Sequence, residues 1–344
     1  MIEECLLICI LLVLGTIYHY KPELLGLEHY VEYDPLVKYG ENIVWTYIER
    51  PYSGSKSKSH FSNNYLEDIP YYLKICTLLM EKACRINIKF IVLTPENICK
   101  YLSDFPIIMN FTSQYSLKYR VDLLGSYILE KYGGVWLSPG TLIRKKDFYV
   151  DIFKKLKEVD LVTFGSDDSI INNCSLETNP DNLVIAAKRE NVIISLYKNL
   201  LKRQQIKYQL PIDTIDRING HDNRDIIDTS RFNLSQDSNI GVYSLGESFR
   251  IAKVSEIPFT HYNLSCLYDG RKDIYNRYIT INDLLSTSEI YFANNDKLLF
   301  IAVPYYDLYE LSDTRWFYNL SESQFYDSKI NLVKYVKNTI KMLK

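Results

Sequence analysis

One acidic residue stands in an apolar stretch of the sequence where it could do chemistry. Asp122 lies between Val121 and Leu123, and apolar residues recur around it at the spacing of a helix with one buried face. A buried carboxylate needs a hydrogen-bonded partner, so Asp122 is predicted to contact a ligand or another polar group. The alternative is a solvated acid in the first turn of the helix.

A pair of acidic residues follows a predicted strand at 160–164. Asp167 and Asp168 stand at the carboxyl end of that strand, where open α/β sheets bind their ligands. A carboxylate at this place can take the proton of an acceptor hydroxyl, which makes Asp168 the candidate catalytic residue. A solvated loop acid is the alternative interpretation.

The cysteines and histidines indicate neither a metal site nor a disulfide framework. The seven Cys are odd in number and lack paired C-x-x-C spacing, and the five His include no H-x-x-x-H pair. His261, in the sequence PFTHYN, is a candidate phosphate contact, and a structural histidine is the alternative. No metal-binding residue is predicted.

The composition is that of a globular protein with a large core. The 344 residues are 47% hydrophobic and 24% charged, which excludes a disordered or collagen-like chain. The 40 basic and 42 acidic residues leave a net charge of −2. A protein that binds nucleic acid by neutralising phosphates needs a basic excess, so nucleic acid is not an expected partner.

The first residues predict attachment to a membrane. Residues 5–20 (CLLICILLVLGTIYHY) contain no Asp, Glu, Lys or Arg. A helix of this length spans about 24 Å, somewhat less than the ~30 Å hydrocarbon core of a bilayer. We interpret residues 1–20 as an uncleaved single-pass anchor and 21–41 as a stem. A cleaved signal peptide and a buried first helix are the alternatives.

Strands and helices alternate over the rest of the chain. Helices and strands of these lengths predict an open, mainly parallel sheet with helices on both faces. Strands are expected at 42–49, 88–93, 134–138, 160–164, 182–187 and 298–303, and helices at 67–86, 114–132, 148–158, 190–203 and 328–343. The loops at the carboxyl ends of the strands are the expected ligand sites.

A longer motif surrounds Asp122. Residues 118–143 read KYRVDLLGSYILEKYGGVWLSPGTLI, and the Gly133-Gly134 pair suits a helix cap on structural grounds alone. The segment resembles the central motif of the DXD-type sugar transferases and the related capsular polysaccharide synthesis proteins, roughly S/A-D-L-L-R-x-x-L-L-x-K-Y-G-G-V-Y/W-L-D-x-D/T. The segments IVWTYIE at 43–49 and NLVIAAK at 182–188 resemble two flanking strands of that family.

The resemblance implies a GT-A-like glycosyltransferase that transfers a sugar, with retention, from a nucleotide-sugar donor to a glycan or glycoconjugate acceptor. Retention needs no general base, whereas inversion needs a carboxylate to take the acceptor proton, for which Asp168 is the candidate. It makes 42–205 the nucleotide-sugar-binding region and 206–344 the C-terminal part of the same domain. In the family the first strand packs against the nucleoside and the Asp of the helix helps to hold the donor. The implied donor-binding residues are Trp45, Thr46, Tyr47, Asp122, Ser138 and Gly140; for the first three, core aromatics of a strand are the alternative.

Two departures from the family pattern bear on the chemistry. Gly125 replaces the family Arg, and Ser138-Pro139-Gly140 replaces the D-x-D that grips Mn²⁺ or Mg²⁺. These hard cations need several oxygen ligands, and a single hydroxyl is a poor substitute for two carboxylates. A metal-independent transferase would neutralise the diphosphate with backbone N–H groups or with nearby cations. Those cations are Lys118, Arg120, Arg144, Lys145 and Lys146, and for the last three a solvated turn is the alternative.

Three hypotheses therefore remain. The first is a membrane-anchored glycosyltransferase, with Mn²⁺ or Mg²⁺ as the only cofactor that the resemblance suggests. The second is a catalytically inactive protein that binds a sugar nucleotide or a glycan, motivated by the missing carboxylates at 138–140. The third is a structural membrane-surface protein that keeps only the fold. Turnover separates the first two, and the third predicts no nucleotide binding.

Overall fold

The computed structural model describes a large part of the chain after the N-terminal segment. The described residues are 37–38, 40–48, 69–95, 97–103, 117–166, 179–209, 240–265, 273–275, 277, 279–292, 297–303 and 314–343. Residues 41–344 form one compact unit. The predicted anchor at 1–20 and most of the stem at 21–41 lie outside the described residues. Within the described ranges, no helix has the length and apolar character needed to cross a membrane.

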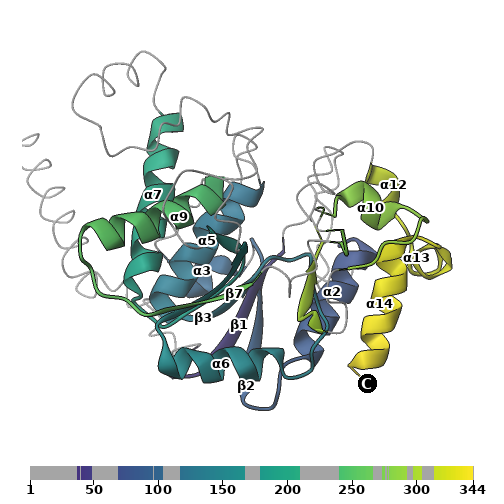
Figure 1. Ribbon diagram of the computed structural model, residues 1–344, viewed down its shortest axis with the longest axis horizontal. Helices are drawn as coiled ribbons and strands as arrows, with labels where there is room; N and C mark the ends of the chain where they lie inside the picture. Colours follow the sequence, from purple (N-terminus) through teal and green to yellow (C-terminus); the bar gives the residue numbers. More distant parts are fainter. Residues whose placement is uncertain are drawn as a thin grey trace, which may run out of the picture. The chain divides into compact units, whose positions relative to one another are not determined.

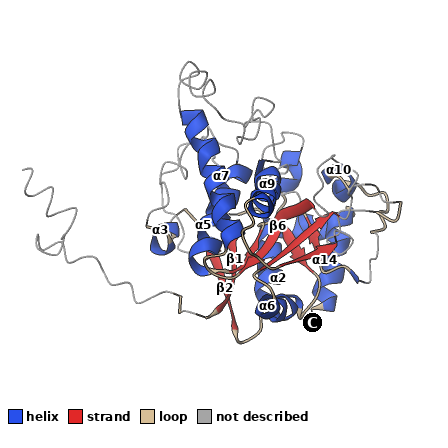
Figure 2. Ribbon diagram, turned by 60° about the vertical axis from the view of Figure 1, so that its left-hand side comes forward, coloured by secondary structure: helices blue, strands red, loops and turns tan. Residues whose placement is uncertain are grey.

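A six-stranded sheet occupies the centre of the compact unit (Figures 1 and 2). Its order is β2-β1-β3-β6-β5-β7. The β1/β2, β1/β3 and β5/β7 pairs are parallel, as predicted for most of the sheet. The strand bounds are Asn42–Tyr47 (β1), Ile88–Leu93 (β2), Gly134–Leu137 (β3), Leu161–Ser166 (β5), Asn179–Ala187 (β6) and His261–Ser265 (β7).

Strand β6 departs from the predicted parallel arrangement. It runs antiparallel to both of its neighbours, β3 and β5. A parallel neighbour would require a crossover of about a dozen or more residues, usually a helix, and the sequence between β5 and β6 has no helical pattern. The sheet is therefore mixed, and the first residues of β6 lie beside the carboxyl ends of β3 and β5.

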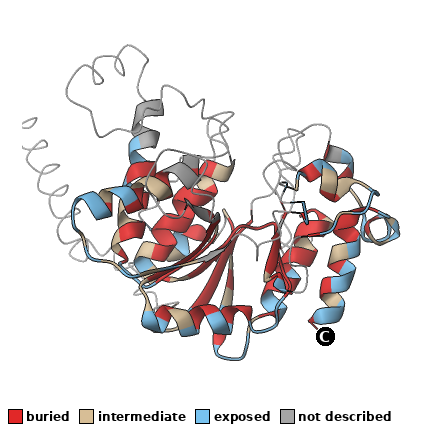
Figure 3. Cartoon of the chain, viewed as in Figure 1, coloured by how far each residue is buried: buried red, intermediate tan, exposed pale blue. Residues whose placement is uncertain are grey.

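Helices cover both faces of the sheet, as predicted (Figure 1). On one face, α5 (Leu117–Tyr132), α7 (Val192–Gln209) and α9 (Ile240–Val254) pack against one another, and α5 and α9 contact β6. On the other face, α6 (Phe148–Glu158) buries Phe148, Ile152 and Leu156 against the strands. The buried residues lie in the sheet and on the inner sides of these helices (Figure 3).

The C-terminal part packs beside the sheet around a short two-stranded ribbon. Strands β4 (Thr141–Ile143) and β8 (Phe300–Ala302) pair antiparallel, and β4 contacts α2 (Tyr71–Lys82) and α14 (Asn331–Met342). Aromatic contacts between Tyr72, Phe317 and Phe325 join α2 to α12 (Arg315–Tyr318) and α13 (Glu322–Asp327). Two further helices of the described ranges are α3 (Ile98–Tyr101) and α10 (Ile281–Leu285).

Helix α5 packs very closely on β3 because it carries a glycine at the contact. Trp45 of β1 and Trp136 of β3 are register partners beneath this helix. A Cβ atom on Gly125 would lie 2.6 Å from Cε2 of Trp136. The Arg that the family has at this position would therefore meet the indole ring here, so Gly125 is a packing residue in this protein.

We expect Gly125→Ala to destabilise the fold although alanine favours helices. The added methyl overpacks against the buried Trp136 ring, which costs about 1–3 kcal/mol and exceeds the helix-propensity gain of about 1 kcal/mol. Urea unfolding should show a lower midpoint. The matched control is Gly246→Ala in α9, where nothing lies within 4 Å of the position that the new methyl would take; this variant should be as stable as the wild type or more so. Equal midpoints for both variants would contradict the close packing of α5 on Trp136.

Candidate functional site

Three elements bring polar groups together next to Asp122. Asp122 of α5 is 5% exposed and Asn182 of β6 is 4% exposed. A Cβ atom on Gly241, in the first turn of α9, would lie 1.9 Å from Oδ2 of Asp122 and 2.3 Å from Nδ2 of Asn182. The carboxylate and the amide therefore lie side by side beneath the backbone of α9. The burial of Asp122 disfavours the alternative of a solvated acid.

A register shift in β6 releases Asn182 from regular pairing with β5. Thr163 pairs with Ile185, whereas the next residue, Phe164, pairs with Asp181. The intervening residues of β6 make no regular pairs with β5, and such irregularities re-aim side chains. Asn182 lies at the amino-terminal half of an antiparallel strand, which places it beside the carboxyl ends of β3 and β5. Ligands bind at this edge in open α/β sheets.

Asn182 is a site residue that the sequence pattern alone does not single out. The available signal is the motif NLVIAAK at 182–188, which by itself indicates only a strand. The structure buries the side chain, and its Nδ2 has no hydrogen-bond partner among the described residues. A buried amide donor that lacks a partner is costly, so a ligand atom would satisfy it.

Ser138 and Gly140 form a tight turn after β3. The Ser138 N–H donates to the Leu183 carbonyl at 2.8 Å, and the Ser138 carbonyl accepts from the Thr141 hydroxyl at 2.7 Å. Ser138 is 4% exposed, and its own hydroxyl has no hydrogen-bond partner within the described part of the chain. The Gly140 carbonyl accepts from the Val303 N–H at 3.1 Å, which ties the turn to the residue after β8.

The first strand does not present the nucleoside surface that the resemblance implies. Trp45 and Thr46 are 0% exposed and Tyr47 is 2% exposed. The Trp45 indole N–H donates to the Gly133 carbonyl at 3.0 Å, and the Thr46 hydroxyl donates to the Leu137 carbonyl at 3.0 Å. Because their polar atoms bond to the backbone inside the core, Trp45 and Thr46 pack as core residues, which favours that alternative over a base and ribose pocket.

The turn at 138–140 does not fit the Mn²⁺ or Mg²⁺ ion that the family resemblance implies. It offers a hydroxyl and backbone carbonyls but no carboxylate, whereas these cations prefer carboxylate oxygens. Among the residues that the structure describes, no group of three His, Cys, Asp or Glu could hold a metal ion. Asp168, the predicted catalytic residue, lies outside the described residues.

His261 belongs to a partly buried polar layer under α9. Its Nε2 lies 2.7 Å from the Thr163 hydroxyl, which donates to Oδ1 of Asn263 at 3.0 Å, so Nε2 is the donor to Thr163. The ring centroids of His261 and Phe249 are 4.6 Å apart. Burial lowers the pKa of His261 from 6.5 to about 4, so the ring is neutral near pH 7. These contacts favour the structural interpretation over a phosphate contact.

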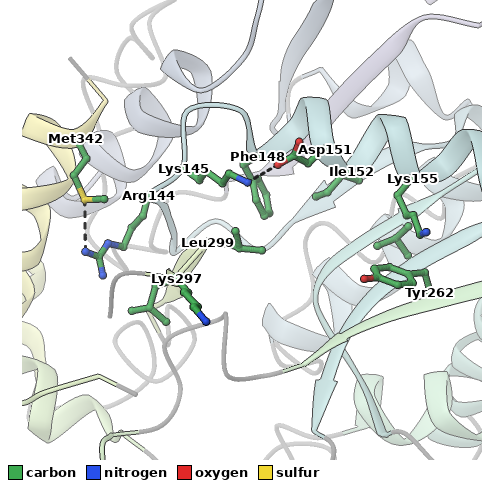
Figure 4. Close-up of a pocket in the computed structure, with 12 residues that line it drawn as sticks. Arg144, Lys145, Phe148, Asp151, Ile152, Lys155, Tyr262, Lys297, Leu299 and Met342 are labelled. Carbon is green, nitrogen blue, oxygen red and sulfur yellow. Dashed lines mark hydrogen bonds and ion pairs between the residues drawn. The ribbon is translucent and has the colours of Figure 1, made fainter. Parts of the chain in front are cut away.

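Arg144 and Lys145 of the basic run lie on the other face of the sheet from α9. Arg144 and Lys145 line a cavity along α6 together with Val162 of β5 (Figure 4). The next residue of β5, Thr163, contacts the layer under α9, and successive side chains of a strand point to opposite faces. Arg144 and Lys145 are thus directed away from Asp122, so the structure does not support their role in neutralising a diphosphate there.

Gly241→Ala should displace the first turn of α9. The added methyl would lie 1.9 Å from Oδ2 of Asp122, too close for any real contact. We expect faster amide hydrogen exchange over the first turn of α9. Overpacking should also lower the free energy of unfolding by about 1–3 kcal/mol. Gly246→Ala, in the same helix, is the control and should leave exchange unchanged. Unchanged exchange in Gly241→Ala as well would mean that α9 does not contact Asp122.

Acid should destabilise the protein partly through His261. Its folded pKa of about 4 lies below the value of 6.5 for the unfolded chain, so the unfolded state binds the proton first. The stability that His261 contributes is therefore complete above about pH 6.5 and is lost as the pH falls toward 4. In urea unfolding at several pH values, His261→Gln should show a smaller loss than the wild type over this range. Parallel pH profiles would contradict the neutral, buried assignment.

Comparisons with known proteins come from a family model and from solved structures. No curated protein matches the sequence. The structure of the bifunctional IspDF from Campylobacter jejuni is 10% identical with a TM-score of 0.30, covering 71% of this chain and 53% of that chain. This chain thus spans about half of that protein. The 4-diphosphocytidyl-2C-methyl-D-erythritolsynthase from Anaerococcus prevotii DSM 20548 is 9% identical with a TM-score of 0.25, covering 60% of this chain and 96% of that chain.

The family comparison bears on the segment that contains the site. Residues 64–214 match the model of the family described as capsular polysaccharide synthesis protein. This range includes α5, the turn at 138–140 and β6, and therefore Asp122, Ser138 and Asn182. The resemblance seen in the motif at 118–143 is confirmed: residues 64–214 carry the sequence pattern of the capsular polysaccharide synthesis protein family.

Proposed function

We propose that this protein is a glycosyltransferase that transfers a sugar from a nucleotide-sugar donor to a glycan or glycoconjugate in polysaccharide synthesis. The observation that carries the proposal is the buried contact of Asp122 and Asn182 under Gly241, inside the segment that matches the family. Its position at the carboxyl ends of β3 and β5 is the position at which sheets of this kind bind ligands.

The chemistry of the cluster suits a sugar. An ionised carboxylate only accepts hydrogen bonds, whereas an amide both donates and accepts, so Asp122 and Asn182 together complement hydroxyl groups, which do both. Their burial strengthens these hydrogen bonds relative to water. Gly241 allows α9 to lie directly over the carboxylate, which excludes water from one side of the site.

The turn after β3 supports a contact to the donor at the same edge. The buried Ser138 hydroxyl has no hydrogen-bond partner in the described ranges, and a donor oxygen would supply one. Departure of a nucleoside diphosphate requires stabilisation of negative charge by oriented donors. We assign Ser138 to this edge of the donor site, and we keep Asp168 as the proposed catalytic residue that accepts a proton from the acceptor.

A protein that binds a sugar nucleotide without transferring it is the second candidate function. The missing carboxylates at 138–140 favour it. In the family that the sequence resembles, Mn²⁺ or Mg²⁺ assists departure of the diphosphate, and the turn does not fit such a cation. Binding of the donor is common to both candidates, and turnover distinguishes them. The apolar segment 5–20 supports our further proposal that the chain is anchored to a membrane by residues 1–20.

The proposal predicts that Asp122→Asn weakens donor binding by about ten- to a hundredfold and leaves the fold intact. The full-length protein is heated with each of a panel of nucleotide sugars, once with Mn²⁺ and once with EDTA. A donor at 100 times its Kd should stabilise the wild type by about 2.7 kcal/mol. Loss of a charge-assisted hydrogen bond should weaken binding by about 1.5–3 kcal/mol in the variant.

The matched control is Ser126→Ala, one turn further along α5. Ser126 is also buried, but its hydroxyl donates to the Leu123 carbonyl of its own helix at 2.6 Å. This variant should bind the donor like the wild type. Equal donor stabilisation of Asp122→Asn and Ser126→Ala would remove Asp122 from the site. Release of free sugar from the stabilising donor supports a transferase, and stabilisation without release supports the second candidate.

A further inference from the structure

A second polar cavity runs along α6, on the face of the sheet opposite Asp122 (Figure 4). Its volume is about 640 Å³, within the range of about 300–1,000 Å³ that ligand pockets occupy. Helix α6 forms one side, and the residues that lead into β8 form the other. We call it the α6 groove. None of the residues assigned above to the donor site lines it.

The α6 groove carries a marked positive charge. Four basic side chains and one carboxylate line it, and the neighbouring Glu158 pairs with one of the lysines, which leaves a local balance of +2 in a chain whose net charge is −2. Lys145 pairs with that carboxylate, Asp151, at 2.5 Å, and Lys155 pairs with Glu158 at 2.7 Å. The other two are Lys297, which is exposed, and Arg144, which is only 5% exposed and has its Nη2 3.6 Å from Sδ of Met342. A concave positive surface attracts anions more strongly than isolated surface charges do.

The floor of the groove is apolar. Phe148 and Ile152 of α6, Val162 of β5 and Leu298 are buried beneath the charges. At one end the Tyr262 ring is 39% exposed, with the Lys155 ammonium 4.4 Å from its centroid. Ligand pockets commonly combine such an apolar and aromatic floor with a few charged groups that fix orientation. The ligand should therefore present both C–H surface and negative charge.

The charges are spread along the groove and do not converge on one point. Figure 4 shows Arg144 and Lys297 toward one end, Lys145 between, and Lys155 beside Tyr262 at the other end. A single small anion would require converging donors, and an acyl chain would require an enclosed apolar tunnel. A chain of sugar rings with repeated negative groups matches both the spacing and the floor.

We propose that the α6 groove binds an acidic glycan chain that carries carboxylate or phosphate groups. This inference rests on the proposed function, for which it names the acceptor class. The groove lies on the opposite face of the sheet from the donor site. The body of the growing chain lies in the groove, and its reacting end reaches the carboxyl ends of β3 and β5. Negative groups of the chain contact Lys297, Lys145 and Lys155, and its rings lie over Phe148, Ile152 and Tyr262.

The test is binding of a fluorescent hexagalacturonate to the full-length protein by anisotropy, with no donor present. Lys297→Glu should weaken binding by about tenfold, because an attractive contact becomes repulsive, whereas Lys297→Arg should bind like the wild type. The matched control is Lys154→Glu, which makes the same charge change on an exposed position of α6 that does not line the groove. It should leave binding unchanged. Added salt should weaken wild-type binding.

Three results would overturn the proposal. Maltohexaose, a neutral chain of the same length, could bind as tightly as hexagalacturonate; a single-stranded oligonucleotide of equal charge could compete equally well; or Lys297→Glu and Lys154→Glu could bind alike. The donor stabilisation assay, run on the same variants without glycan, separates this proposal from the proposed function. Glycan binding without donor binding would contradict the proposed transferase function alone. Donor binding without glycan binding would contradict only the proposal for the α6 groove.

Discussion

The close approach of α5 to the sheet determines where the carboxylate of the site lies. Gly125 permits this approach because its missing side chain leaves room for the Trp136 ring, which a Cβ would meet at 2.6 Å. Asp122 stands three residues earlier on the same face of the helix. A larger residue at 125 would lift α5 and withdraw Asp122 from Asn182 on β6. The packing of one glycine on one tryptophan thus controls the geometry of the site.

A second close contact closes the site from the side of α9. Gly241 brings the first turn of this helix onto Asp122 and Asn182, and the rest of α9 rests on the hydrogen-bonded set of Thr163 and His261. The interface beneath α9 is therefore partly polar, and its buried groups depend on their hydrogen bonds for stability. The opposite face differs in character, because α6 buries apolar residues there and basic side chains line its groove. The sheet thus separates the site of Asp122 and Asn182 on one face from the basic α6 groove on the other.

Local patterns predict much of the fold. The bounds of β2 and α6 agree with the prediction, because an unbroken apolar run at 88–93 and an amphipathic repeat at 148–158 are determined by near neighbours. The direction of β6 and its register shift depend on long-range pairing, which no local pattern reveals. For the same reason the burial of Asp122 could be predicted from its apolar neighbours, whereas the contact with Asn182 and Gly241 could not. The burial of Trp45 favours the core alternative over a nucleoside contact, and sequence alone could not decide between them because an aromatic strand residue looks the same whether it faces a ligand or the core.

The central claim is that a sugar donor binds at the edge of the sheet formed by Asp122 and Asn182, and a crystal structure of the full-length protein with a stabilising nucleotide sugar tests it most directly. We predict that the sugar hydroxyls contact the Asp122 carboxylate and the Asn182 amide at the carboxyl ends of β3 and β5, with a donor oxygen on the Ser138 hydroxyl. A donor bound elsewhere, with Asp122 and Asn182 still buried under Gly241, would contradict the claim.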